Sequence, residues 1–171
     1  MSTLFLVEFT PSPSTAEGSR QLLSDIAASS DLVEAQITAD HARVFAIVEG
    51  NDAETVAQQL EALRPASEPA AVRLVGADLA TVKAARPEAG YLVEWDIPSH
   101  IDMDTYLTRK AEKTPLYSSI PEVSFLRTYV REDMGKCLCF YDAPDADAVL
   151  RAREIVSTPV NRLHALTGIV L

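Results

Sequence analysis

Two glutamates stand inside otherwise apolar strand sequences, and their carboxyl groups are the first candidates for chemistry. Glu94 lies in residues 92–95 (LVEW) and Glu8 in residues 6–9 (LVEF). Because strand side chains alternate between two faces, Glu94 points away from its bulky neighbours and into the space between sheets. Burial there raises the pKa of a carboxyl group unless a cation or a hydrogen-bond donor faces it. Glu94 is therefore predicted to be a general base, a general acid or a metal ligand. The alternative is an ion pair to an arginine between the sheets, or a position at the open rim.

A run of oxygen and imidazole donors follows along the chain. It comprises Glu94, Asp96, His100, Asp102 and Asp104. Such donors suit a borderline divalent metal such as nickel or zinc, so Glu94, Asp96 and His100 are the predicted metal ligands. In the alternative interpretation, Asp102 and Asp104 cap a helix and His100 is a solvated loop residue.

A second polar set lies on the strand predicted at residues 123–130. Arg127, Tyr129 and Arg131 share one face of this strand. If that face is enclosed, Tyr129 offers a hydroxyl group and Arg127 a positive charge to Glu94 or to an anionic ligand. Glu94, Tyr129 and Arg127 are therefore the predicted catalytic residues, and a solvated strand edge is the alternative.

Cys137 and Cys139 place two thiols on one face of a strand. Their Cα atoms would be about 6.5–7 Å apart along an extended chain, which suits a disulfide poorly. Two thiolates can hold a metal with ligands from elsewhere. Small buried apolar side chains are the favoured interpretation.

Each half of the chain shows the same order of elements, which is strand, helix, strand, strand, helix, strand. This order is that of the ferredoxin-like fold. The halves also repeat short sequences, because residues 6–9 return as 92–95 and residues 51–56 return as 144–149. A repeat of this length predicts tandem units. The predicted division is a first repeat at 1–76, a linker at 77–89 and a second repeat at 90–171.

Several strands are apolar on both faces, as residues 44–48 and 138–141 show. Helices can cover only one face, so the other face is predicted to meet a second sheet. The favoured partner is the sheet of the other repeat, which would form a pseudo-dimeric α/β barrel within one chain. The alternative is a homodimer in which a second chain supplies that sheet. The predicted fold class is α+β in either case.

Composition excludes several classes of partner. The net charge is −10, from 25 acidic and 15 basic residues, which argues against nucleic acids and anionic membranes. No apolar run approaches the length of a membrane span. The first residues lack the features of a signal peptide, and two cysteines so close together make no secreted disulfide framework. A cytoplasmic location is therefore expected.

Three sequences in the second half resemble a known family. They are residues 91–94 (YLVE), 125–130 (FLRTYV) and 136–149 (KCLCFYDAPDADAV), with Pro159 ending the helix that follows. They are similar to a bacterial family of ferredoxin-like domains of unknown function that includes a small nickel-binding protein. The resemblance implies a ferredoxin-like fold, an α/β barrel on pairing, and nickel binding.

The resemblance has two limits. The first half matches the same pattern only loosely. Family members often carry a histidine in the second helix, whereas this chain has LRARE at residues 150–154. One candidate metal ligand of the family is therefore missing.

Three functions are compatible with these patterns. The favoured one is a barrel protein that binds a small ligand or a divalent metal ion such as nickel. The alternative is a cofactor-free isomerase, cyclase or oxygenase acting on an apolar small molecule in the barrel cavity, with Glu94 as general base and Tyr129 and Arg127 stabilising negative charge. The third is an accessory or assembly protein without a cavity.

Overall fold

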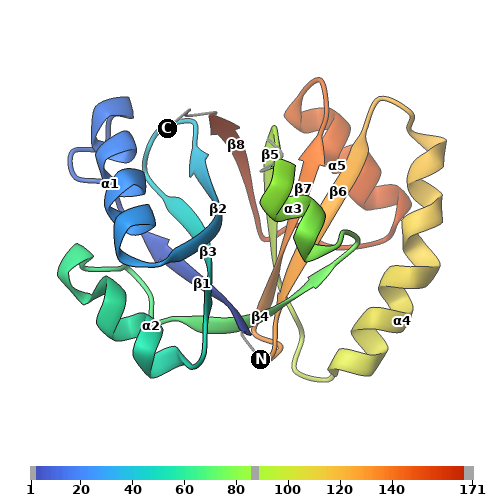
Figure 1. Cartoon of the computed structure of the whole chain (residues 1–171). Helices are drawn as coiled ribbons and strands as arrows, with labels where there is room; N and C mark the ends of the chain where they lie inside the picture. The colour runs from blue at the N-terminus through green and yellow to red at the C-terminus, as the bar shows by residue number, and fades with distance from the viewer. Residues whose placement is uncertain (1–2, 86–88, 168–171) are drawn as a thin grey trace. The chain divides into compact units, whose positions relative to one another are not determined.

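The computed structural model of the 171-residue chain describes residues 3–85 and 89–167. It mixes helices and strands, as the predicted α+β class requires (Figure 1). The chain forms two compact units. Strand β4 (Ala70–Val75) contributes to both, because residues up to Val72 belong to the first unit and 73–77 to the second. Within the described ranges, no helix is long and apolar enough to cross a membrane.

The first unit contains an antiparallel sheet with the strand order β4-β1-β3-β2. Buried apolar residues of α1 and α2 pack with those of β1 and β3 in one core, so both helices lie on the same face. Thr15 and Asp52 begin these helices, and their side chains accept hydrogen bonds from backbone N–H groups of the first turn. The elements are β1 (Thr3–Phe9), α1 (Ala16–Ser29), β2 (Asp31–Thr38), β3 (Val44–Gly50), α2 (Ala53–Leu60), a short 3-10 helix η1 (Glu61–Leu63), β4 and α3 (Leu79–Ala85).

The second unit repeats this arrangement with the strand order β8-β5-β7-β6. Asp102 begins α4 and accepts a hydrogen bond from the Thr105 N–H at 2.8 Å, so the helix-cap interpretation is right for this residue. Asp104 lies in the first helical turn, where a negative charge suits the helix dipole. The elements are β5 (Tyr91–Asp96), α4 (Met103–Lys113), the 3-10 helix η2 (Thr114–Ser119), β6 (Ser124–Arg131), β7 (Lys136–Asp142), α5 (Ala146–Ile155) and β8 (Arg162–Thr167).

The two faces of the second sheet carry different side chains. Val93, Trp95 and Cys139 belong to the core that also contains the buried residues of α4 and α5. Glu94 and Leu138 lie on the opposite face and are buried as well. The alternation predicted for residues 92–95 is therefore present, and the two faces of this sheet have different chemical environments.

Candidate functional site

Glu94 is the buried carboxylate of the second sheet, with only 3% of its surface exposed. Its Oε1 accepts a hydrogen bond from Lys136 Nζ at 2.7 Å, and its Oε2 accepts one from Arg162 Nε at 2.8 Å. His164 Nε2 lies 2.8 Å from the same Oε2. These partners come from β7 and β8, where the strand register places them on the same face as Glu94.

Electrostatics around Glu94 favour the ionised form. Burial alone would raise the pKa of this carboxyl group, but the hydrogen bonds from His164, Lys136 and Arg162 and the charge of Lys136 outweigh burial. The pKa of Glu94 falls to about 2. An ionised carboxylate with such a low pKa is a weak base at neutral pH. The geometry therefore agrees with the ion-pair interpretation and does not favour general-base chemistry.

The donor set near Glu94 does not suit a nickel ion. The Glu94 oxygens already face an ammonium and a guanidinium group, which would repel a dication. Arg162 also holds the Asp96 carboxylate through two hydrogen bonds, of 3.1 and 2.6 Å. Within residues 3–85 and 89–167, no three His, Cys, Asp or Glu side chains gather closely enough to hold a metal, so His100 does not complete a site with Glu94 and Asp96.

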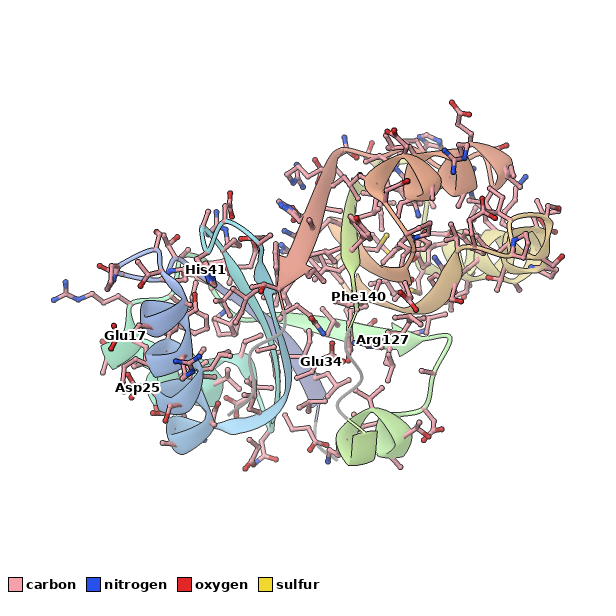
Figure 2. All side chains as sticks on the ribbon, turned by 90° about the horizontal axis from the view of Figure 1, so that it is seen from above. Glu17, Asp25, Glu34, His41, Arg127 and Phe140 are labelled. Atoms are coloured by element: carbon pink, nitrogen blue, oxygen red, sulfur yellow. The ribbon has the colours of Figure 1, made fainter. Side chains whose placement is uncertain are left out.

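Tyr129 and Arg127 share the face of Glu94 but lie on β6, and β7 runs between β6 and β5. Leu138 pairs with Glu94 on one side and with Tyr129 on the other. Two strand spacings separate the two residues by about 10 Å. The Arg127 guanidinium lies 4.8 Å from the centre of the Phe140 ring (Figure 2). The structure therefore brings the predicted catalytic residues to one face without placing Glu94 and Tyr129 side by side.

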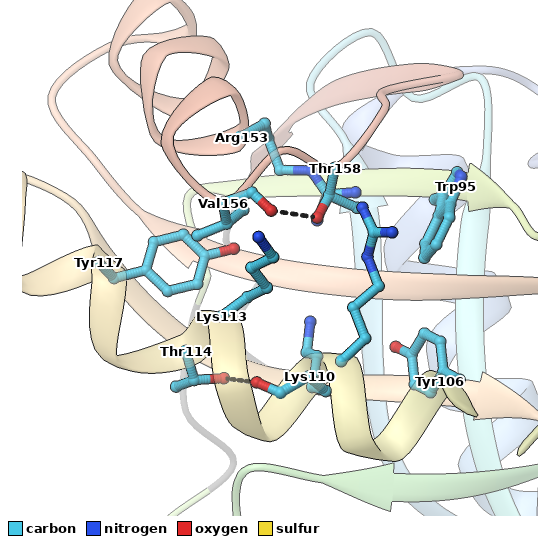
Figure 3. Close-up of a pocket in the computed structure, with 10 residues that line it drawn as sticks. Trp95, Tyr106, Lys110, Lys113, Thr114, Tyr117, Arg153, Val156 and Thr158 are labelled. Atoms are coloured by element: carbon cyan, nitrogen blue, oxygen red, sulfur yellow. Dashed lines mark hydrogen bonds between the residues drawn. The ribbon is translucent and has the colours of Figure 1, made fainter. Parts of the chain in front are cut away.

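A pocket lies on the other face of the same sheet, among the helices of the second unit (Figure 3). Its free space is about 20 Å³, room for about one water molecule. We call it the cationic pocket, because four of its lining residues are basic and none is acidic. The described residues that line it are Trp95, Tyr106, Arg109, Lys110, Lys113, Thr114, Tyr117, Arg153, Val156 and Thr158.

Helix α4 supplies most of the charge. One face of this helix carries Tyr106 and, three, four and seven residues after it, Arg109, Lys110 and Lys113. The Arg109 guanidinium lies 5.7 Å from the centre of the Trp95 ring and donates to the Ser157 carbonyl oxygen. In the described part of the chain, no Asp or Glu forms an ion pair with any basic residue of the pocket.

Arg153 of α5 is the most buried cation of the pocket, at 2% exposed. It donates from Nη2 to the Pro159 carbonyl oxygen at 2.7 Å and from Nη1 to the Tyr141 hydroxyl at 3.0 Å. Among the described residues, its Nε, the Nε of Arg109 and the hydroxyl of Tyr106 are buried without a hydrogen-bond partner. Unpartnered buried polar groups are rare in native proteins, so these three groups are available to hydrogen-bond a ligand or a water molecule in the pocket.

The sequence interpretation did not identify the cationic pocket. Two sequence patterns could have indicated this pocket. One is the helical spacing of Tyr106, Arg109, Lys110 and Lys113, and the other is the position of Arg153 on the helix face that carries the apolar residues Val149 and Ala152. They were overlooked because basic residues on a helix usually form a solvated face. Only the packing of α4 beside α5 brings these charges together.

Comparison with known proteins connects the second unit to a family. Residues 91–166 match the family described as "Nickel responsive protein SCO4226-like". The resemblance predicted for the second half is thereby confirmed. The matched range includes Glu94, both cysteines and every residue of the cationic pocket. No curated protein matches the chain.

Solved structures show where the fold recurs. A candidate chlorite dismutase has a TM-score of 0.54 and 12% identity, covering 97% of this chain and 94% of its own. A candidate monooxygenase from Lactobacillus acidophilus has a TM-score of 0.52 and 7% identity, with coverage of 97% and 93%. Another from Fusobacterium nucleatum has a TM-score of 0.50 and 10% identity, with coverage of 97% and 91%. At such identities the similarity shows a shared fold only.

Proposed function

We propose that this chain binds a small organic anion, and that the cationic pocket of the second unit holds its carboxylate. One observation carries the proposal. A chain with a net charge of −10 gathers four cations around one pocket, and within the described residues none of the four forms an ion pair with a carboxylate. Like charges held together in this way repel one another, and an anionic ligand would remove that repulsion.

The shape and lining of the pocket define the ligand class. Its free space of about 20 Å³ holds about one water molecule, so the flexible side chains of Lys110 and Lys113 must move apart to admit a carboxylate head group. Guanidinium groups such as those of Arg109 and Arg153 match the planar geometry of a carboxylate. Trp95, Tyr106 and Tyr117 offer aromatic surface to the remainder of an organic acid. We therefore expect an aromatic or aliphatic monocarboxylate to bind better than inorganic phosphate.

Isothermal titration of the full chain with benzoate, inorganic phosphate and nickel chloride tests the proposal. We expect saturable heat with benzoate, weaker binding of phosphate, and a benzoate affinity lowered about tenfold or more by Arg109→Gln or Lys113→Gln. Arg151→Gln is the matched control, because it removes the same charge from an exposed site on α5 that pairs with Glu122. Absence of heat with benzoate, or equal affinity in all variants, would overturn the proposal.

Nickel binding is the second candidate, since residues 91–166 match a nickel-responsive family. The surroundings of Glu94, Asp96 and His100 do not favour it. Saturable heat with nickel chloride that His100→Ala and Glu94→Ala abolish would replace the anion proposal. The enzyme alternative, with Glu94 as general base, is weaker still because the pKa of Glu94 is about 2.

The barrel is the structural part of the proposal. We propose that the repeats form a pseudo-dimeric α/β barrel within one chain. The shared fold of solved structures that cover 97% of the chain supports this arrangement. Light scattering tests it against the homodimer, because a monomer agrees with the internal barrel and a stable dimer with pairing between chains.

A further inference from the structure

We propose that anion binding in the cationic pocket is coupled to the uptake of a proton by Cys139. This inference rests on the proposed function and concerns the regulation of the same pocket. Cys139 is the internal counter-anion of Lys110 and Arg153, and a carboxylate in the pocket takes over that role.

The Cys139 sulfur is surrounded by donors. Lys110 Nζ lies 3.5 Å from Sγ, Thr128 Oγ1 lies 3.3 Å from it, and Arg153 Nη1 lies 3.6 Å from it. Cys137 Sγ is 3.9 Å away on the same strand. A thiolate accepts hydrogen bonds better than a thiol does, so a shell of two cations, a hydroxyl and a second thiol favours the charged form of Cys139.

Every element packed against the sulfur contributes neutral or basic groups. Helix α4 supplies Lys110 and Tyr106, and α5 supplies Arg153. The neighbouring strands supply Cys137 and Tyr141 from β7 and Thr128 from β6, and η2 supplies Tyr117, which bonds to Tyr141. The hydrogen bond between the two cysteine sulfurs, together with the charges of Lys110 and Arg153, lowers the pKa of Cys139 well below its usual range, although burial opposes this shift. The same hydrogen bond and burial raise the pKa of Cys137.

Two cations are shared between the sulfur and the pocket. Lys110 and Arg153 line the pocket and also contact Cys139. A carboxylate beside them weakens the positive field at the sulfur, so the pKa of Cys139 rises and the thiolate takes one proton from the solvent. The balance is thiolate plus proton plus free anion giving thiol plus bound anion, with no oxidant or reductant. By linkage, a lower pH that protonates Cys139 strengthens anion binding to the same extent.

Calorimetry of the full chain with benzoate in two buffers of different ionisation enthalpy measures the protons taken up per anion bound. We expect uptake approaching one proton for the wild type and none for Cys139→Ser, which keeps a neutral group of similar size and still binds benzoate. Cys137→Ser is the matched control and retains uptake. The ultraviolet absorbance of the thiolate falls when acetate, which unlike benzoate does not absorb at that wavelength, is added to the wild type.

The outcomes separate the two proposals. Heat of binding without proton uptake, and with unchanged thiolate absorbance, overturns the coupling and leaves the proposed function in place. Absence of binding overturns both. If Cys139→Ser does not fold, Lys110→Met replaces it, because loss of this cation must lower the thiolate absorbance at neutral pH. Unchanged absorbance in that variant overturns the role assigned to Lys110 and with it the coupling.

Discussion

The charged groups on the two faces of the second sheet are paired in different ways. On one face, Glu94 is enclosed by Lys136, Arg162 and His164, so the charges neutralise one another within the protein. On the other face, the basic residues of the cationic pocket contact the Cys139 sulfur and aromatic rings and, in the described ranges, form no ion pair with a carboxylate. A buried charge that is fully paired within the protein supports the fold, whereas cations without a carboxylate partner are available to a ligand.

Removal of the Glu94 carboxylate is expected to have the largest effect on stability. Glu94→Ala removes the buried anion that Lys136 and Arg162 share, although Arg162 keeps its ion pair with Asp96, and loss of one partner from a buried ion pair costs about 3–5 kcal/mol. Urea unfolding checks this, with Asp96→Asn as the exposed control, for which we expect at most about 1 kcal/mol. A loss for Glu94→Ala as small as that of the control would contradict the structural role of Glu94.

In the wild type, lowering the pH should reveal how much the ionised Glu94 contributes to the free energy of unfolding. The folded-state pKa of Glu94, about 2, lies below the ordinary value of 4.5. The carboxylate therefore stabilises the fold fully above pH of about 4.5, and that stabilisation is lost as the pH falls toward 2. The free energy of unfolding of Glu94→Gln should depend less steeply on pH in this window. Parallel pH profiles for the two proteins would count against the hydrogen bonds assigned to Glu94.

Removal of one positive charge from the cationic pocket should leave the free energy of unfolding almost unchanged or raise it slightly, in contrast to the loss expected for Glu94→Ala. Lys113→Gln removes a charge that is repelled by Arg109 and Lys110, so we expect a change within about 1 kcal/mol and toward greater stability at low salt. Urea unfolding at low and high salt measures it. A loss as large as that of Glu94→Ala would mean that the pocket cations hold the fold together.

The smallest effect is expected for Tyr106→Phe. The Tyr106 hydroxyl has no hydrogen-bond partner among the described residues, so its removal should change the unfolding free energy by less than about 0.5 kcal/mol. Benzoate affinity should nevertheless fall several-fold if the hydroxyl donates to the ligand. Thermal unfolding with and without benzoate separates the two effects, and a clear loss of stability without benzoate would assign the hydroxyl a structural partner.

Much of the fold was predictable because it depends on neighbouring residues. The order of elements and the face of the sheet that holds Glu94 follow from periods of two or three to four residues. The helix start at Asp102 or Asp104 follows from the capping preference of Asp, and the structure selects Asp102. The site was less predictable. Glu94 was recognised as an unusual buried carboxylate, but the identity of its cationic partners was not.

Local sequence is sufficient to place Glu94 on the face opposite Val93 and Trp95, and Cys137 and Cys139 on one face of their own strand, because alternation is a local property of an extended chain. Which charged groups come into contact depends on tertiary structure. Lys136 and His164 reach Glu94 across 42 and 70 residues of sequence, through the register of β7 and β8. Likewise, Lys110 and Arg153 converge on Cys139 only because α4 and α5 pack on the same face, and no local pattern encodes that meeting.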